Sequence, residues 1–424
     1  MAEPTTPFTP YQRRLLGFLA VATFFEGYDL LALAQILPNL RADFALSKSG
    51  AGLLVAGINL GAVAAWLLVR QADRWGRRRL LQITIAGYTL CTVGSGLAPE
   101  VTSFGALQLL ARTFLLGEWA VAMIYAAEEF PAARRGLVLG LIQGFSTLGS
   151  ILCAATAPWL LATGWGWRSV YFVGIVPLVL VAYGRRNLRE TERFATLRES
   201  PADTASMGNV IRGPYRARIL LLGLIWSLTY ACTQNAITFW KEFAVGERGL
   251  SDADVGLAVS IAAVASMPLV FAVGKLLDVV GRKRGAAIVF TTTAAGVLGA
   301  YSLHGFWPLT FALALGVFGV AAVLPVLTSF STELFPTAQR AGAYAWANHL
   351  IGRIGPVASP VVLGAAAEAV GWGAALRATA ILPLLALALI AWRLPETAGR
   401  ELEQTSALEP ARGDRPPVPR AQRT

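Results

Sequence analysis

Apolar runs of about 20 residues recur along this chain, and they limit its fold more than any other feature. An α-helix rises about 1.5 Å per residue, so a run of this length crosses the roughly 30 Å hydrocarbon core of a bilayer. Only 14% of the residues are charged and 55% are hydrophobic, whereas about a quarter of a soluble domain is charged. The sequence predicts an all-α membrane protein with twelve transmembrane helices, at 15–37, 50–69, 80–98, 104–127, 136–160, 170–184, 217–240, 253–276, 285–303, 307–331, 342–368 and 374–393.

Basic residues are concentrated in loops on one side of the predicted bundle, and the net charge is +11. Cytoplasmic loops of membrane proteins are rich in Lys and Arg, so this side and both termini are predicted to be cytoplasmic. The charge therefore orients the chain in a membrane, and no nucleic-acid partner is expected. The inner loops hold Arg70, Arg74, Arg77, Arg78, Arg79, Arg134, Arg135, Arg282, Lys283, Arg284 and Arg340, and the outer loops hold Arg41, Lys48, Arg168, Lys241 and Arg248.

Two motifs recur at one fixed offset, which indicates an internal duplication. The stretch "VRQADRWGRRR" matches "GKLLDVVGRKR", and "EEFPAARR" matches "ELFPTAQR". Asp73 and Asp278 are 205 positions apart, as are Arg135 and Arg340. The chain is therefore predicted to contain two six-helix halves in parallel repeat, an arrangement typical of transporters whose halves rock about a site at the bilayer midplane.

The repeat divides the chain into five predicted segments. Two are six-helix bundles, and the other three are cytoplasmic: the N-terminus, the polar, Arg-rich loop between the bundles, and the C-terminal tail. In chain order the segments are 1–14, 15–184, 185–216, 217–393 and 394–424.

The repeated Asp-x-x-Gly-Arg-Arg/Lys-Arg loops resemble the signature of the major facilitator superfamily. The second copy matches fully, whereas the first has Val69 in place of the leading Gly. The stretches "EEFPAARRG", "WRSVYF" and "LPETAGRELEQ" are similar to those of sugar porters and metabolite:proton symporters. The resemblance covers nearly the whole chain, and it implies a transporter and not an enzyme.

The resemblance also implies a gate built from the repeated loops. Charged residues at the helix ends can pair with one another when the inner face of such a transporter closes. The alternative is that these charges only orient the chain in the membrane. The predicted gating residues are Asp73, Arg77, Glu128, Arg135, Asp278, Arg282, Glu333 and Arg340.

Charged side chains inside the predicted helices break the repeat. A shift of 205 positions takes Asp29 to Gln234 and Arg112 to Val317, so these charges serve something other than the shared scaffold. A charge at the centre of a membrane helix costs about 2.5–3.5 kcal/mol, and such residues usually face a cavity and find a partner. Counted from the helix ends, Asp29 and Arg112 lie at nearly the same depth, so we expect them to pair.

The stretches "GYD" and "LARTFLLG" resemble segments of sugar porters and proton symporters in which an Asp–Arg pair couples protonation to movement. This implies that Asp29 and Arg112 couple transport to the proton; the alternative is a static buried salt bridge. "EGYD" further resembles the DGxD motif of aromatic acid:proton symporters, and Glu26 shares a helix face with Asp29. We expect both carboxylates to see one cavity, with Glu26 either a second proton site or a water-facing polar residue. Glu118 is interpreted as the partner of an inner-side charge, with a substrate contact as the alternative.

The eleventh predicted helix contains "GRIGPVASP", which resembles the corresponding helix of organic-anion transporters and acid:proton symporters. The resemblance implies that Arg353 faces the substrate cavity, where its planar guanidinium matches a carboxylate. The alternative is a structural pair of Arg353 with Glu333 or Glu368. The other residues predicted to contact the substrate are Gln234, Asn235, Asn348 and Tyr28.

The sequence gives no reason to expect a metal or a cofactor other than the transported proton. Three cysteines are scattered through predicted helices, and the two histidines share no cluster of ligands. These residues are Cys91, Cys153, Cys232, His304 and His349.

The sequence therefore predicts a proton-coupled symporter that imports a small organic anion, such as an aromatic acid or a monocarboxylate, by alternating access. We expect a monomer in a bacterial-type inner membrane, with the anion, protons and lipid as its partners. The alternatives are a sugar or polyol:proton symporter, a drug efflux antiporter and a non-transporting solute sensor. The fifth predicted helix has Gly140, Gly144 and Gly149, as close helix packing requires, and it lacks the Gly-Pro element of drug:proton antiporters.

Overall fold

The computed structural model describes residues 8–70, 75–176, 207–399 and 405. Every regular element in these ranges is helical, in agreement with the all-α prediction. The sixth predicted span lies outside the described residues from 177 onwards, as do most of the loop at 185–216 and most of the C-terminal tail.

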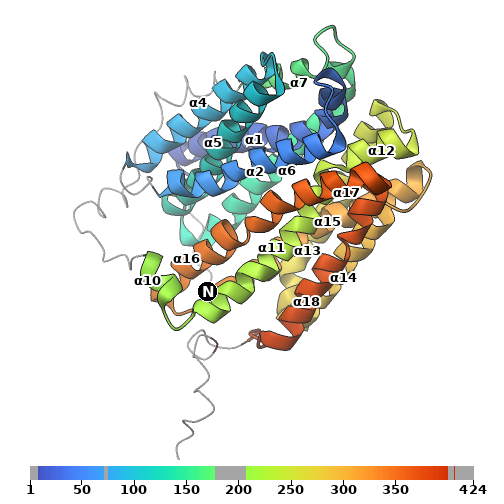
Figure 1. Cartoon of the computed structure of the whole chain (residues 1–424). Coiled ribbons are helices and arrows are strands. Elements are labelled where there is room, and N and C mark those ends of the chain that lie inside the picture. The colour runs from blue at the N-terminus through green and yellow to red at the C-terminus, as the bar shows by residue number, and fades with distance from the viewer. Residues whose placement is uncertain (1–7, 71–74, 177–206, 400–404, 406–424) are drawn as a thin grey trace, which may run out of the picture.

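The first half of the chain forms one bundle of helices, coloured blue to green in Figure 1. The first helix begins at a capping box, in which Thr9 accepts a hydrogen bond from the backbone of Gln12 and Pro10 occupies the first turn. The elements of this half are α1 Pro10–Asp43, α2 Lys48–Val69, α4 Arg77–Gly96, α5 Val101–Glu129, α6 Ala132–Leu161, α7 Arg168–Phe172 and the 3-10 turn η1 Val173–Ile175.

The second half forms a second bundle, coloured green to red in Figure 1. Its eleventh predicted span is divided by a π-helical segment, which replaces regular α-helix just before Arg353. The elements of this half are α10 Met207–Arg212, α11 Arg216–Thr238, α12 Trp240–Arg248, α13 Asp252–Val280, α14 Arg282–Ala300, α15 Phe306–Glu333, α16 Thr337–Tyr344, the π-helix η2 Ala345–Ile351, α17 Ile354–Ala378 and α18 Ile381–Arg393.

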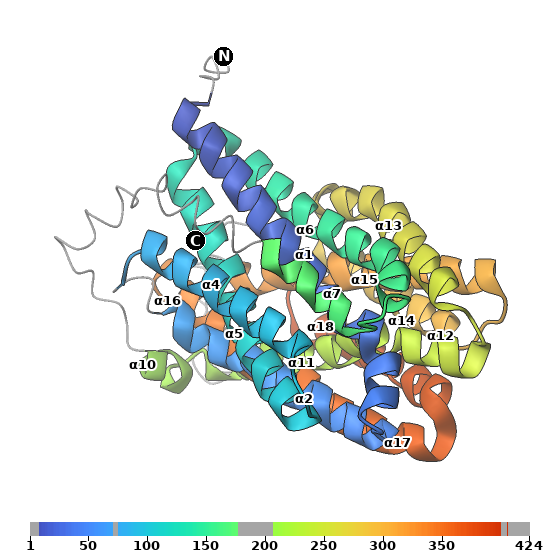
Figure 2. The ribbon, with the colours of Figure 1, turned by 90° about the horizontal axis from the view of Figure 1, so that it is seen from above.

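Helices at equivalent positions pack in the same pairs in the two halves. α1 packs on α6 as α11 packs on α17, α2 on α5 as α13 on α15, and α4 on α5 as α14 on α15. Between the halves, α2 contacts α17 and α13 contacts α6, as Figures 1 and 2 show. The second long helix of each half therefore meets the fifth of the other, and the duplication inferred from the 205-residue offset is present in the tertiary structure.

Glycine lets α1 and α6 approach each other at backbone contact. A Cβ added to Gly149 would overlap the carbonyl oxygen of Phe24, so the close packing predicted for Gly149 is confirmed. Gly140 and Gly144 have no atom within 4 Å of an added Cβ. The packing prediction is wrong for these two glycines, because the face of α6 that carries them has no neighbouring helix in contact.

The outer surface of the two bundles suits a membrane. Within the described residues, eight helical segments are long and apolar enough to cross a bilayer. Trp159 and Trp307 are exposed near one end of the molecule, and Trp75 and Trp392 near the other. Tryptophan is enriched at both membrane–water interfaces, so these four side chains mark the two edges of the apolar band. The eight segments are Pro10–Asp43, Lys48–Val69, Val101–Glu129, Gly136–Leu161, Arg216–Thr238, Asp252–Val280, Phe306–Glu333 and Gln339–Arg393.

Candidate functional site between the two halves

The two halves meet at one end of the molecule and diverge at the other. We call the end at which α4 and α14 begin, with Arg77 and Arg282, the basic end, and the other the opposite end. At the opposite end α2 lies against α17, where a Cβ added to Gly52 would overlap the carbonyl oxygen of Pro360. Close backbone contact therefore holds the halves together at this end.

Charged side chains close the opposite end across the two halves. Arg41 of α1 pairs with Glu242 of α12, with 2.6 Å between Nη1 and Oε2. Lys241, which is buried, donates to the carbonyl oxygen of Gln35 at 2.6 Å and pairs with Asp252 at 2.6 Å. These contacts, here called the opposite-end seal, connect α1 to the C-terminal half. The sequence reading assigned Arg41 and Lys241 only to loops and missed this seal, because it depends on which helix ends meet across the halves.

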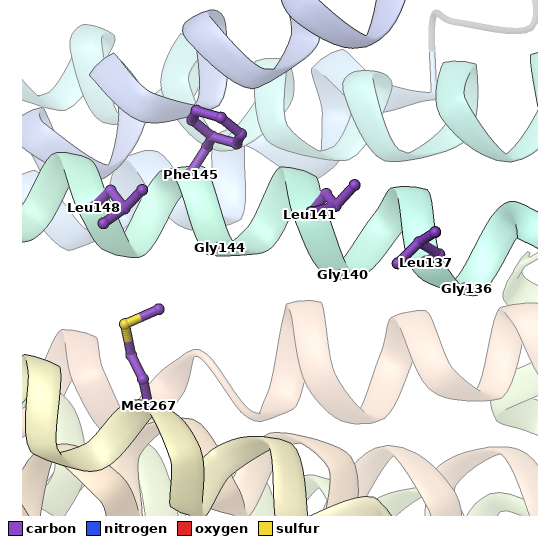
Figure 3. A pocket seen from close by; sticks show the side chains of 8 residues that line it. All are labelled: Gly136, Leu137, Gly140, Leu141, Gly144, Phe145, Leu148 and Met267. Carbon is purple, nitrogen blue, oxygen red and sulfur yellow. The ribbon is translucent and has the colours of Figure 1, made fainter. Parts of the chain in front are cut away.

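At the basic end an apolar crevice separates α6 from α13. Its volume is about 470 Å³, and in Figure 3 its labelled residues lie on α6 except Met267, which faces them from α13. The same two helices touch nearer the opposite end, where an added Cβ of Gly256 would lie 2.6 Å from the carbonyl oxygen of Ala154. The structure therefore shows a state that is closed at the opposite end and open at the basic end. The crevice is lined by Gly136, Leu137, Gly140, Leu141, Gly144, Phe145, Leu148 and Met267.

Asp29 and Arg112 line one small polar cavity inside the N-terminal half, together with Thr92, Gln108 and Tyr171 among others. Thr92 donates a hydrogen bond to Asp29 Oδ2 at 3.3 Å, while Asp29 Oδ1 is buried without a partner. Asp29 and Arg112 are close enough to interact electrostatically, but they form no ion pair in this state. The cavity brings together the two residues predicted to pair, and leaves their carboxylate and guanidinium apart.

Glu26 takes a different place from the one expected. Its side chain is 2% exposed and accepts a hydrogen bond from Ser146 of α6 at 3.0 Å. It does not line the cavity that holds Asp29. The expectation that both carboxylates see one cavity is therefore wrong for this state, because α6 packs tightly enough on α1 to cover Glu26.

Arg353 lies at the break between η2 and α17, where the regular helix resumes at Ile354. Its guanidinium lies 4.9 Å from the centroid of the Tyr230 ring, and its Nε is buried without a hydrogen-bond partner. The alternative pairings with Glu333 and Glu368 are wrong, since Glu333 pairs with Arg282 and Glu368 accepts from the backbone of Ser49. No acidic side chain among the described residues forms an ion pair with Arg353.

The two halves present one arginine each toward the region between them. Arg112 and Arg353 are close enough to repel each other electrostatically. Neither forms an ion pair with a carboxylate within the part of the chain that the structure describes. Two guanidinium groups from opposite halves therefore add positive potential to this region, where Asp29 and Glu26 act on Arg112 electrostatically without forming an ion pair with it.

The other residues predicted to contact the substrate divide into two groups. Gln234 is half-buried, and its side-chain amide forms no hydrogen bond within the part of the chain that the structure describes. Asn235 is buried and donates to Ser359 and to Ala231, so its amide joins α11 to α17. The arrangement keeps Gln234 as a candidate contact and gives Asn235 a packing role in this state.

Asn348 and Tyr28 are also engaged by the protein itself. Asn348 accepts from Tyr230 at 3.0 Å and donates to Tyr344 at 2.8 Å, which fixes the aromatic ring beneath Arg353. Tyr28 is fully buried, and its hydroxyl donates to the carbonyl oxygen of Val170. A substrate contact of Tyr28 is therefore not supported, whereas Asn348 positions Tyr230.

The predicted gating residues form ion pairs within each half. Arg77 pairs with Glu128 at 3.2 Å, and the repeat-equivalent Arg282 pairs with Glu333 at 3.1 Å and with Asp278 at 2.7 Å. These three ion pairs each lie within one half. Arg340 donates to the carbonyl oxygen of Phe335. Asp73 and the side chain of Arg135 lie outside the described residues.

Glu118 contradicts its interpretation as the partner of an inner-side charge. The residue is 0% exposed, and neither of its carboxylate oxygens has a hydrogen-bond partner. A Glu inside an apolar run is rare and so marks Glu118 in the sequence, but only the structure shows that its carboxylate has no partner among the described residues.

Two helical bundles with buried charges near their interface and a crevice at one end are typical of a membrane transporter. The chain belongs to the Major Facilitator Superfamily, whose family description matches residues 19–246 and 227–421. The match includes both halves, as the internal repeat requires.

Relatives of known sequence match most of the chain. The probable 4-methylmuconolactone transporter of Cupriavidus pinatubonensis is 28% identical over 93% of this chain and 93% of its own length. The cis,cis-muconate transport protein of Acinetobacter baylyi is 28% identical over 82% of this chain and 86% of its own, and the niacin transporter NiaP of the same organism is 26% identical over 84% and 88%.

Solved structures show the same fold. The xylose transporter XylE from E. coli in an inward open conformation superposes with a TM-score of 0.74 and 19% identity, over 93% of this chain and 98% of that one. At this identity the likeness extends to the fold alone.

Proposed function

We propose that this transporter imports a small organic anion together with a proton, by alternating access across a bacterial-type inner membrane. The observation that carries the proposal is the proximity of Arg112 and Arg353, one from each half and neither paired with an acid among the described residues. An anion between them relieves their mutual repulsion and holds the halves together on either side of it. A planar guanidinium binds a carboxylate through two parallel hydrogen bonds, so a carboxylic acid is the best-matched class of substrate.

The proposal includes twelve membrane spans with both termini in the cytoplasm. Gln339–Arg393 contains both α17 and α18, which makes two crossings from one of the eight apolar segments. The equivalent helices α4 and α14 are 20 and 19 residues long and add two more. The twelfth is the span predicted at 170–184. With an even number of spans, the basic end faces the cytoplasm on the positive-inside rule.

The substrate site combines the two arginines with a few neutral groups. The Tyr230 ring, fixed by Asn348, supports the Arg353 guanidinium from below and limits its movement. Gln234 lies four residues after Tyr230 on α11, and so on the same helix face. Its amide can bind a hydroxyl or ring nitrogen of the substrate, while the carboxylate binds the arginines.

Competition for Arg112 explains how the proton is coupled. When no anion is bound, Arg112 can pair with Asp29 across their shared cavity and keep that carboxylate ionised. When the anion engages Arg112, Asp29 retains only its hydrogen bond from Thr92. An ionised carboxylate left buried without a counter-charge is costly, so Asp29 then binds a proton. Anion and proton are therefore bound and released together.

The named substrates of the relatives support the same chemical class. Muconate and niacin are carboxylic acids, one a dicarboxylate and the other an aromatic acid. Both place a carboxylate on a planar, unsaturated frame. A single guanidinium fork binds either one, and the second arginine suits a second carboxylate.

The test is uptake of labelled acids into liposomes that contain the purified protein. We expect cis,cis-muconate or niacin to accumulate when an inward-directed proton gradient is imposed, and glucose, the matched neutral solute, to show no such uptake. Uptake of an acid that is indifferent to the gradient would reject proton coupling. Gradient-driven uptake of glucose that the acids do not inhibit would establish the sugar porter instead.

A further inference from the structure

The N-terminal half buries a third carboxyl group that the coupling scheme does not use. Glu118 on α5 is 0% exposed, and both of its oxygens lack a hydrogen-bond partner. Tyr88 on α4 is also 0% exposed, and its hydroxyl has no partner either. Orphaned polar groups are rare in protein interiors, so two of them on adjacent helices call for a physical account.

These groups belong to one cluster. Glu118 interacts electrostatically with Glu26 of α1, and Tyr88 with Glu118, Glu26 and Asp29. The charged groups that face the cluster are therefore carboxyls from α1 and α5, with Arg112 acting on Glu26 and Asp29 but not on Glu118. Glu118 has no cation beside it among the described residues.

The cluster extends along the membrane normal toward the basic end. α1 runs from the basic end to the opposite end, so Glu26 lies about 4.5 Å nearer the basic end than Asp29. α5 runs in the other direction, so Glu118 lies about 9 Å nearer the basic end than Arg112. Asp29, Glu26 and Glu118 therefore lie successively nearer the basic end, which is the open end in this state.

The chemistry of a buried acid without a donor or cation is restricted. Burial of an ionised carboxylate removes its hydration, and without a donor or cation no interaction offsets that free-energy cost. Burial of the neutral acid costs far less. A neutral carboxyl can also donate its own proton to an acceptor next to it. Glu26 already accepts one hydrogen bond from Ser146 and has a second oxygen available.

We propose that Glu118 carries a proton in this state, and that Glu26 and Tyr88 connect it to Asp29 in one proton-sharing cluster. This inference rests on the proposed function and extends it, by adding a second proton-binding position to the coupling machinery. Transfer breaks an O–H bond on the donor carboxyl and forms one on the acceptor carboxylate, so the charge moves with the proton and no other reactant is needed.

The first experiment requires no substrate. Infrared spectra at neutral pH are recorded for the wild type and for two variants. One variant is Glu118→Gln. The other is Glu100→Gln, a matched change at the exposed N-cap of the same helix. We expect the wild type and Glu100→Gln to share a protonated-carboxyl C=O band, sensitive to deuterium, which Glu118→Gln lacks. A band that survives in Glu118→Gln, with only ionised-carboxylate bands lost, would overturn the proposal.

The second experiment asks whether the proton moves. With cis,cis-muconate in liposomes, Glu118→Gln should lower accumulation by about tenfold for each pH unit of gradient, as expected when one coupled proton is lost. Exchange of labelled for unlabelled muconate across the membrane should persist, and Glu118→Asp should recover part of the accumulation. Wild-type accumulation in Glu118→Gln would show that the carboxyl is only a packing group. If the wild type itself ignores the pH gradient, the proposed function fails, while the infrared result still decides the protonation of Glu118.

Discussion

The two halves of the transporter share their helix packing but differ in what they bury. Glu26 and Glu118 are buried carboxyls of the N-terminal half, and 205 positions further the C-terminal half has Ala231 and Val323, both buried and apolar. The scaffold is thus duplicated, while among the described residues the buried carboxyls Glu26 and Glu118, which form no ion pair, lie in the N-terminal half; the buried Glu242 of the C-terminal half is paired with Arg41.

The C-terminal half departs from the repeat in its backbone, through the π-helix η2. The π-helix η2 covers Ala345–Ile351, whereas the equivalent residues 140–146 lie in regular α-helix within α6. π-Helical segments frequently occur at functional sites, because they change the direction of the side chains that follow. Arg353 follows this segment, while its equivalent, Leu148, lines the apolar crevice.

On the proposed function, the two copies of one fold carry different roles. The N-terminal half buries the carboxyls proposed to exchange a proton, and the C-terminal half positions the arginine proposed to bind the anion. Arg112 would connect the two roles, because it interacts electrostatically with both Asp29 and Arg353. The following changes test this comparison.

The largest effect is expected at Asp29. Asp29→Asn removes the carboxylate proposed to alternate between Arg112 and a proton. Without it the binding of anion and proton is no longer linked, so accumulation driven by a pH gradient, including the share proposed for Glu118, should be abolished while exchange persists. Liposome uptake with and without the gradient measures both. Adding Gln234→Asp places a carboxylate at the equivalent position of the other half and should not restore coupling, since the Thr92 and Arg112 environment is missing there. Coupling that survives in Asp29→Asn would move the assignment to Glu26.

Removal of the arginine of the C-terminal half should affect the anion and not the proton. Arg353→Ala is expected to weaken binding of niacin at least tenfold, because loss of one partner of a desolvated charge pair costs about 2–5 kcal/mol. Arg353→Lys should recover only part, since an ammonium lacks the planar fork. Calorimetry on the purified protein measures both, with nicotinamide as the neutral control. Equal losses for niacin and nicotinamide would show that Arg353 is structural.

Overpacking of the equivalent helix contacts should destabilise the two halves alike, although the buried charged groups of the two halves differ. A Cβ at Gly149 overlaps Phe24 of α1, and one at Gly355 overlaps Ser227 of α11, which is the equivalent helix pair. Both Gly→Ala changes should destabilise the protein by about 1–3 kcal/mol through overpacking. Gly140→Ala, on the open face of α6, is the matched control. Thermal unfolding in detergent measures the three variants, and a Gly140→Ala protein as unstable as the other two would contradict the packing described here.

The smallest effect is expected at the ends of the molecule. Arg41→Ala breaks an ion pair between the halves, so it should favour opening of the opposite end by at least about twofold, because Arg41 is partly exposed while its partner Glu242 is buried. Arg282→Ala breaks pairs within one half and should change this opening less. Labelling of a cysteine at position 35, beneath the opposite-end seal, by a reagent that cannot cross the membrane reports the difference. Equal labelling in the two variants would show that the seal does not hold the halves together.

Much of the fold could be predicted from the sequence. Long apolar runs leave few alternatives to membrane helices, because an unpaired backbone polar group in hydrocarbon costs several kcal/mol. The 205-residue offset predicted the two halves and marked the repeated loops as candidate gates, whereas the individual pairs of Arg77 with Glu128 and of Arg282 with Glu333 are visible only in the structure. The sequence also identified Asp29, Arg112 and Arg353 as unusual, because charges in apolar helices are rare and break the repeat.

The direction in which each side chain points was decided by the tertiary structure alone. Glu26 is three residues from Asp29 on the same helix, yet α6 covers it while Asp29 lines a cavity shared with α5. The seal made by Arg41 and Glu242 and the isolation of Glu118 also depend on which helices meet. The physical reason is that membrane insertion is set by the local cost of placing each segment in hydrocarbon, which a sequence encodes directly. The energy of a buried charge is instead set by neighbours that are distant in the chain.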